Sequence, residues 1–156
     1  QNVNKFTYEK EVTKVSRRYT DFLTVLIMAH IVQRFVDPKS QEPYTVEQLA
    51  DQCHIPVRLT TMIVRQLLAL NLIVEVKYTK QSRTGNYYPA VDPETLTVGS
   101  LIARLDSVGS ENFKVDRRKY AREWELTLAS RASLQEESTH VLLKHLPLGR
   151  EHLCPI

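Results

Sequence analysis

Residues 44–76, YTVEQLADQCHIPVRLTTMIVRQLLALNLIVEV, constrain the fold of this chain more than any other stretch. Their apolar residues recur first at spacings of three and four, the helical period, and then alternate in a β-branched run. Thr45 and Gln48 have the spacing of a capping box, which satisfies the first free amides of a helix. Pro56 suits the first position of a second helix, where its missing N–H costs nothing. The stretch therefore predicts a helix, a tight turn, a second helix and a strand.

The second helix is predicted over Pro56–Leu70, and Asn71 suits the left-handed position that follows a helix end. Its apolar stripe is expected to face the core, which leaves the intervening residues for the exposed side. This stripe consists of Leu59, Met62, Ile63, Gln66, Leu67 and Leu70.

Residues 72–91 predict a β-hairpin directly after the two helices. LIVEVKY alternates and is rich in β-branched residues, TKQSRTGN is a polar turn, and YYPAV is a second strand whose Pro89 indicates a sheet edge. A hairpin in this position is the wing of a winged helix-turn-helix domain.

Further helices flank this unit, so the expected fold is mainly α with a small β-hairpin and a C-terminal helical extension. The first helix begins after Ser16 or Thr20 and runs to about Phe35, with apolar residues at helical spacing. A short helix follows Thr97, and a charged helix covers 117–133. We expect three segments: residues 1–15 as a lead-in or linker, residues 16–106 as the winged-helix domain, and residues 107–156 as a helical extension with an irregular tail.

The composition fits one globular domain and argues against a strong, nonspecific binder of polyanions. The 156 residues are 42% hydrophobic and 25% charged, and the formal net charge is only +3. No run of 18 apolar residues is present, so no segment of this sequence is expected to cross a membrane. Cys53 and Cys154 have no metal-ligand or redox spacing, which favours a reducing compartment. The first residue is Gln1 rather than Met, which predicts a piece of a longer protein or a processed product.

If the domain reads DNA, the helix after CHIP is the recognition helix. From Thr45 to Val91 five Lys and Arg residues stand against three acidic residues, a net charge of +2. Because each neutralised phosphate adds a salt-dependent increment of affinity, so few cations support only weak binding. The alternative is a solvated helix face and an ordinary polar hairpin. The candidate nucleic-acid-binding residues are Arg58, Thr60, Thr61, Arg65, Lys77, Lys80 and Arg83.

No constellation of residues indicates catalysis. The chain contains no Gly-rich phosphate loop, no paired His and Cys ligand set and no nucleophile motif. His30 lies on an apolar helical face, which is typical of a core histidine, and Cys53 with His54 is too small a set to hold a metal. We therefore predict no catalytic residues, no metal site, no cofactor and no enzyme activity.

Four stretches together resemble the C-terminal cytoplasmic portion of the YihY/BrkB family of bacterial membrane proteins, formerly labelled ribonuclease BN. They are QNVNKFTYEKEV, SRRYTDFLTVLIMAHIVQRF, the 44–76 stretch and YYPAVDPETLTVGSLIARLD, which cover about residues 1–106 in order. The resemblance implies membrane-spanning helices upstream of Gln1, that membrane-embedded domain as a partner, and a position on the cytoplasmic side of the bacterial inner membrane. It carries over no catalytic residues, since the family has no agreed molecular activity and the nuclease label is regarded as a misassignment.

Residues 44–106 also resemble the winged-helix repressors that hold an iron–sulfur cluster through three clustered cysteines. The shared pattern is a helix-turn-helix, a wing and a short helix that follows Thr97. The cysteine cluster is missing here, and the glycine-rich turn of the wing is reduced to Gly85. This resemblance implies a DNA-binding regulator without cluster sensing.

Two functional hypotheses follow from these patterns. The favoured one is an interaction domain of an inner-membrane protein that docks on the membrane domain, on another copy of itself or on a protein partner, because cations on the second helix are few. The alternative is a winged-helix transcription regulator that binds DNA through Pro56–Leu70 and the hairpin tip.

Overall fold

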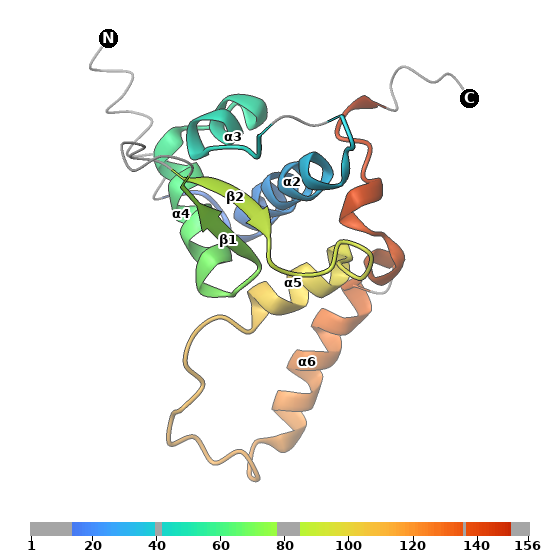
Figure 1. Ribbon diagram of the computed structural model, residues 1–156. Coiled ribbons are helices and arrows are strands. Elements are labelled where there is room, and N and C mark those ends of the chain that lie inside the picture. The colour runs from blue at the N-terminus through green and yellow to red at the C-terminus, as the bar shows by residue number, and fades with distance from the viewer. Residues whose placement is uncertain (1–13, 40–41, 78–84, 136, 151–156) are drawn as a thin grey trace.

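The computed structural model describes residues 14–39, 42–77, 85–135 and 137–150, and Figure 1 shows their arrangement. The elements follow in the order α2, α3, α4, β1, β2, α5 and α6, and two short 3-10 helices, η1 and η2, come last. The described chain is a winged helix, mainly helical with one two-stranded antiparallel hairpin, which confirms the predicted fold class.

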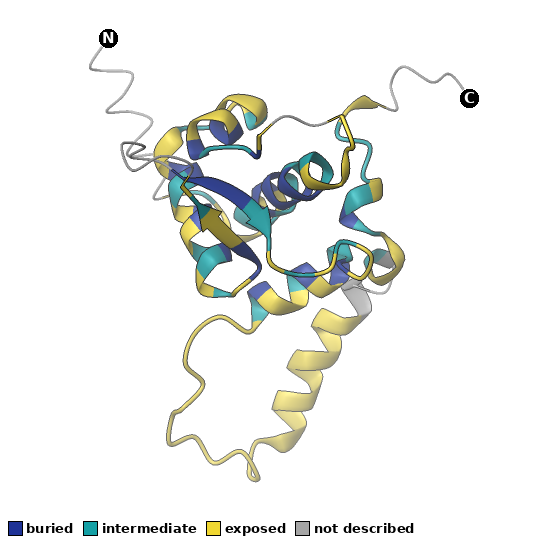
Figure 2. Ribbon diagram, viewed as in Figure 1, coloured by how far each residue is buried: buried dark blue, intermediate teal, exposed yellow. Residues whose placement is uncertain are grey.

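Helix α2, Arg17–Val36, forms the centre of the core. Of the two predicted caps it uses Ser16, whose hydroxyl accepts a hydrogen bond from the amide three residues later at 3.2 Å. Ile27, Met28 and Val32 are fully buried. Buried residues lie on most sides of the middle of this helix because α3, β2, α5 and η2 all contact it (Figure 2).

The helix-turn-helix and the wing lie beside α2. Helix α3 spans Val46–Cys53, α4 spans Val57–Ala69, β1 spans Ile73–Val76 and β2 spans Asn86–Pro89. The two strands pair antiparallel, with Ile73 opposite Pro89 and Val76 opposite Asn86. Because α4 contacts both α3 and β1, the wing is held directly against the helix-turn-helix.

Helix α5, Val98–Asp106, begins at the predicted cap, Thr97. The Thr97 hydroxyl accepts from the Ser100 amide at 3.0 Å, and the Ser100 hydroxyl accepts from the Thr97 amide at 3.0 Å. This reciprocal pair is a capping box with serine in the position where Glu or Gln is more usual. Leu101 and Leu105 are buried on the inner side of the helix.

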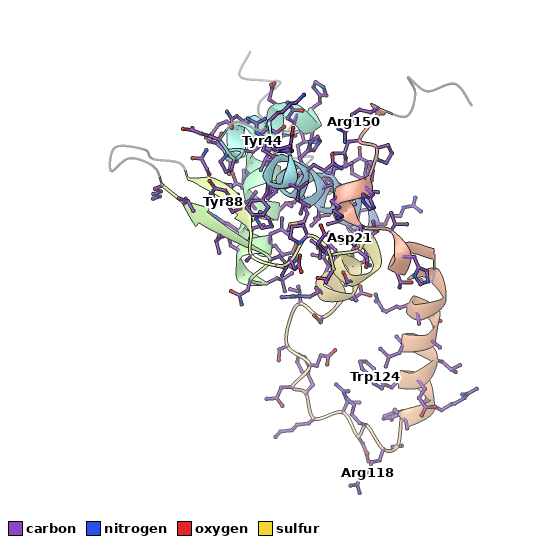
Figure 3. All side chains as sticks on the ribbon, turned by 45° about the vertical axis from the view of Figure 1, so that its right-hand side comes forward. Asp21, Tyr44, Tyr88, Arg118, Trp124 and Arg150 are labelled. Carbon is purple, nitrogen blue, oxygen red and sulfur yellow. The ribbon has the colours of Figure 1, made fainter. Side chains whose placement is uncertain are left out.

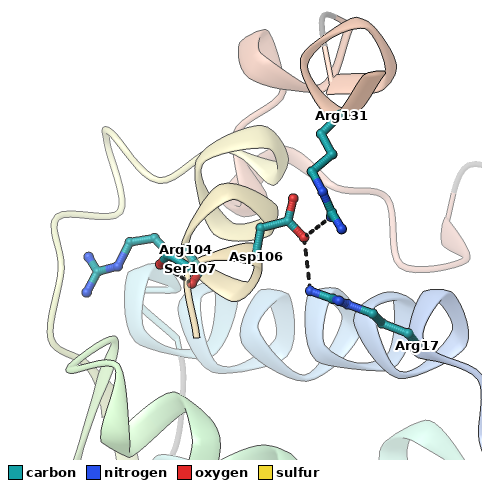
Figure 4. Close-up of polar contacts among 5 residues, drawn as sticks. All are labelled: Arg17, Arg104, Asp106, Ser107 and Arg131. Carbon is teal, nitrogen blue, oxygen red and sulfur yellow. Dashed lines mark hydrogen bonds and ion pairs between the residues drawn. The ribbon is translucent and has the colours of Figure 1, made fainter. Parts of the chain in front are cut away.

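Helix α6, Ala121–Gln135, projects away from the body of the domain (Figure 1). All residues from 107 to 132, which include the loop before this helix, are exposed (Figure 2). Its ionic link to the body is Asp106, whose Oδ1 accepts from Arg131 at 2.8 Å and from Arg17 at 3.3 Å (Figure 4). Asp106 thus joins α2, α5 and α6 at one carboxylate.

After α6 the chain returns to the core through η1, Glu137–His140, and η2, Leu143–His145. Leu143 is fully buried, and its amide donates to the Leu96 carbonyl at 3.0 Å. From α2, the Gln33 side-chain amide donates to the carbonyls of Leu146 at 2.7 Å and Leu143 at 3.2 Å. No periodicity in the sequence indicates this return.

The close approach of η1 to α5 generates a stability prediction. A Cβ atom at Gly99 would lie 2.9 Å from the Thr139 backbone, which is closer than real contacts allow. Gly99→Ala gains up to about 1 kcal/mol of helix propensity but overpacks the contact by about 1–3 kcal/mol. We therefore expect a net loss of about 1 kcal/mol in the free energy of unfolding, measured by urea denaturation. Ala103→Ser, which adds an atom on the exposed side of α5, is the control, and equal stability of the two variants would contradict the close approach.

Candidate nucleic-acid interface

The turn between α3 and α4 is built by two local motifs. At the start of α3, the Thr45 hydroxyl accepts from the Gln48 amide at 3.3 Å while the Gln48 side chain accepts from the Thr45 amide at 2.9 Å, which confirms the predicted capping box. At its end, His54 adopts the left-handed conformation with φ 54°, and the Ile55 amide donates to the Ala50 carbonyl at 3.1 Å. This bond is the Schellman closure of a helix end.

Helix α4 begins and ends close to the predicted residues. Pro56 is its N-cap rather than its first helical residue, and its φ of −60° suits either position. Asn71 has φ 57°, as the sequence predicts, and its amide donates to the Leu68 carbonyl at 3.0 Å. The Leu72 amide donates to the Leu67 carbonyl at 3.0 Å, so a second Schellman motif turns the chain into β1.

The exposed face of α4 differs from the predicted one at two residues. Met62, expected in the core stripe, is 53% exposed, and Thr60, expected to contact nucleic acid, is fully buried. The Thr60 hydroxyl donates to the Pro56 carbonyl at 3.1 Å, which satisfies it inside the protein. Both predictions were wrong because the buried side of α4 is shifted from the predicted stripe. It includes Thr60 and Val64 in addition to Leu59, Ile63 and Leu67. The exposed face consists of Val57, Arg58, Met62, Arg65 and Ala69.

The other candidate residues lie at the edge of this face. Thr61 is half-buried and donates its hydroxyl to the Val57 carbonyl at 2.9 Å. Lys77 is exposed just after β1. Lys80 and Arg83 lie outside the described residues. Within the described part of the chain, the cations that the structure places on α4 and the wing are therefore Arg58, Arg65 and Lys77.

The wing is fixed to the segment that leads into α3, a feature for which the sequence carries no motif. The Tyr87 amide donates to the Tyr44 carbonyl at 3.1 Å. Asn86, a buried polar residue at the start of β2, donates from its side chain to the Pro43 carbonyl at 2.5 Å. These bonds set the wing relative to the helix-turn-helix.

Carboxylates moderate the positive charge of this surface. Burial raises the pKa of the Tyr87 hydroxyl, the charges of Glu75 and Glu47 raise it further, and Arg65 opposes them. Arg65 therefore shares one electrostatic neighbourhood with two acids from α3 and β1. An anion that approaches Arg65 therefore also meets the repulsion of these two carboxylates.

Comparison with known proteins gives structural matches only. No family model matches the chain, and no curated protein matches its sequence. The IscR structure from T. potens aligns with a TM-score of 0.60 at 20% identity, over 91% of this chain and 91% of that one. CymR from Staphylococcus aureus aligns with a TM-score of 0.55 at 17% identity, over 81% of this chain and 93% of that one. CymR from B. subtilis, described as its global cysteine regulator, aligns with a TM-score of 0.54 at 16% identity, over 83% of this chain and 92% of that one.

These likenesses support the winged-helix fold, since they extend over most of this chain and of each matched chain. None of the three structures is described as an enzyme or as part of a membrane protein. Among the described residues, no helix combines the length and the apolar character that crossing a bilayer requires.

The bond from Asn86 to Pro43 yields a second stability prediction. In Asn86→Ala the buried Pro43 carbonyl loses its side-chain donor, which costs about 1–3 kcal/mol for an unsatisfied buried group. We expect the free energy of unfolding to fall by that amount in urea denaturation. Asn112→Ala, in the exposed loop before α6, should change it by less than about 0.5 kcal/mol. Matching losses in the two variants would show that the wing is not held by this bond.

Proposed function

We propose that the chain is a winged-helix DNA-binding transcriptional regulator that acts as a homodimer. The observation that carries this proposal is the open face of α4, which presents Arg58 and Arg65 beside the wing. The likeness to the global cysteine regulator CymR supports it at the level of the fold. No catalytic step is part of the proposal.

The geometry of α4 suits insertion into a major groove. Arg58 and Arg65 are seven residues apart, so they lie on one side of the helix and are separated by about 10 Å along its axis. Arginine is the residue that most often reads guanine in the major groove, and it also binds phosphates. Met62 lies between the two arginines and offers an apolar contact for a thymine methyl group. Lys77 adds a phosphate contact from the wing, and we include Lys80 and Arg83 in the same role.

Substitution of the α4 arginines tests DNA recognition. A preferred duplex is first selected from a random library with the wild-type protein, and its affinity is measured by fluorescence anisotropy. We expect Arg58→Ala and Arg65→Ala each to weaken binding by about 1–3 kcal/mol where the side chain contacts a base. Arg118→Ala, which removes the same charge from the loop far from α4 (Figure 3), should have little effect. Failure to select any sequence, or equal losses in all three variants, would refute DNA reading by α4.

Helix α6 supports the dimer. Along residues 121–132 it is exposed, and Trp124 and Leu128, which are one turn apart on the same side of the helix, are 36% and 46% exposed. A helix of this length is only marginally stable in water unless an apolar face is packed, so α6 needs a partner. The partner we propose is α6 of a second copy, because a two-fold dimer places two recognition helices one helical turn of DNA apart.

The dimer has an internal optical probe. Trp124 is the only tryptophan of the chain, and the Arg117 guanidinium lies over its ring at 4.3 Å. We expect Leu128→Asp to abolish the dimer in light-scattering chromatography, because burial of an unpaired carboxylate in an apolar interface is costly. Trp124 emission should shift to longer wavelength as the indole becomes exposed to water. Val57→Asp makes the same kind of change at the start of α4 and should leave the dimer intact. A monomeric wild-type protein at micromolar concentration would contradict the proposal.

Attachment to a membrane-embedded domain, expected from the YihY/BrkB resemblance, remains a prediction. Its test is the coding sequence upstream of Gln1, where a run of about 20 apolar residues would encode a membrane span. A regulator that binds DNA through α4 is compatible with either result.

A further inference from the structure

A cleft of about 460 Å³ lies on α2, and none of its lining residues belongs to α4. Its walls come from the C-terminal half of α2, from the segment that leads into α3 and the end of α3, and from η2 and the chain after it. Figure 3 shows Tyr44 and Arg150 on this side of the molecule, at the opposite end from Arg118. Its size is within the range of sites for small organic ligands.

The cleft is rich in positive charge. Arg34, Lys144 and Arg150 line it together with a single carboxylate, Asp37. A cleft with this excess of cations favours an anionic occupant over a neutral or cationic one.

The partners of these cations leave donors available to a ligand. Arg34 donates from Nε to the Glu42 carbonyl at 3.0 Å, and its guanidinium lies 4.2 Å from the centre of the Tyr44 ring. Arg150 bonds to the neutral Gln33 side chain and to the Pro147 carbonyl at 3.0 Å, so no carboxylate compensates its charge in these bonds. Each arginine carries five N–H donors, more than these contacts use. Lys144 differs from the two arginines because a carboxylate compensates its charge: its Nζ lies 2.5 Å from Glu94 Oε1.

His30 and Tyr44 add a planar, mostly apolar wall. Their rings meet edge to face with centroids 6.1 Å apart. Burial lowers the pKa of His30, and the charge of Arg150 lowers it further. The imidazole is therefore neutral at neutral pH and offers one donor and one acceptor. The positive charge available to a ligand then resides on Arg34 and Arg150, because Lys144 is paired with Glu94.

We infer that this cleft binds a small organic anion with carboxylate or phosphate groups, held by the forks of Arg34 and Arg150, and that the anion is the effector of the regulator. Anion binding is inferred from the lining of the cleft alone, whereas the effector role rests on the proposed function. Guanidinium groups match carboxylate and phosphate oxygens in pairs, which makes two arginines in the lining of one cleft suitable ligands for such an anion. The alternative, a solvated cleft whose charges serve only internal bonds, predicts no saturable binding.

A route from the cleft to the DNA-binding elements is present in the contacts. Tyr44, which stacks with Arg34, directly precedes the α3 cap, Thr45. Its carbonyl accepts from Tyr87 of the wing at 3.1 Å. An anion that binds the Arg34 guanidinium pulls it away from the Tyr44 ring and shifts the segment that positions both α3 and the wing. Ligand and DNA are then linked, and each changes the affinity of the other by the same factor.

The binding step is tested on the DNA-free protein by titration calorimetry with two probes, citrate for carboxylates and inorganic pyrophosphate for phosphates. Ionic strength is held constant with sodium chloride. We expect saturable binding of at least one probe at one site per chain, and a loss of about tenfold or more in affinity in Arg34→Gln and Arg150→Gln. Arg118→Gln removes the same charge from the far loop and should bind as the wild type does. No binding of either probe, or an equal loss in Arg118→Gln, overturns the site.

The effector role is tested by repeating the anisotropy measurement on the selected duplex with the bound probe at saturation. A change of about threefold or more in duplex affinity that disappears in Arg34→Gln supports it. Unchanged duplex affinity with intact anion binding overturns the effector role and leaves the site. Anion binding without any DNA binding refutes the proposed function and leaves the site as well, so the failures are distinguishable.

Discussion

The burial of α2 is the constraint on which the rest of the structure depends. Ile27, Met28 and Val32 are fully buried because four other elements pack around this helix. The helix-turn-helix, the wing, α5 and η2 therefore share one core and are positioned through it. A change in any one of these contacts is transmitted to the others through a rigid, close-packed interior.

Local signals in the sequence predicted most of the fold, whereas contacts between residues far apart in the sequence produced no recognisable signal. The caps at Ser16, Thr45 and Thr97 and the left-handed Asn71 are recognised because each depends on residues within one turn. The return of Leu143 to α2 was not predicted, since it rests on burial and on bonds from Gln33, more than 100 residues away in sequence. Such contacts have no periodicity.

The candidate site was predicted in part, and the errors have one cause. Arg58 and Arg65 lie on the exposed face of α4, but Thr60 and Met62 exchange the sides expected of them. A single apolar stripe does not define the buried side of a helix that packs in two directions, as α4 does here. The acids around Arg65 come from α3 and the wing, so their effect was also beyond local patterns.

The modest charge of the α4 face and the unpacked α6 have a common explanation in the proposed dimer. One copy offers about five cations from α4 and the hairpin, which supports only weak binding at physiological salt. Two copies joined through α6 double the phosphate contacts and make the second binding event intramolecular, so affinity rises without further charge. The carboxylates near Arg65 then reduce binding to arbitrary DNA while a correctly spaced pair of half-sites is still recognised. A small number of cations on each copy is therefore expected when specificity comes from the spacing and orientation of two DNA half-sites. The low charge does not argue against DNA binding.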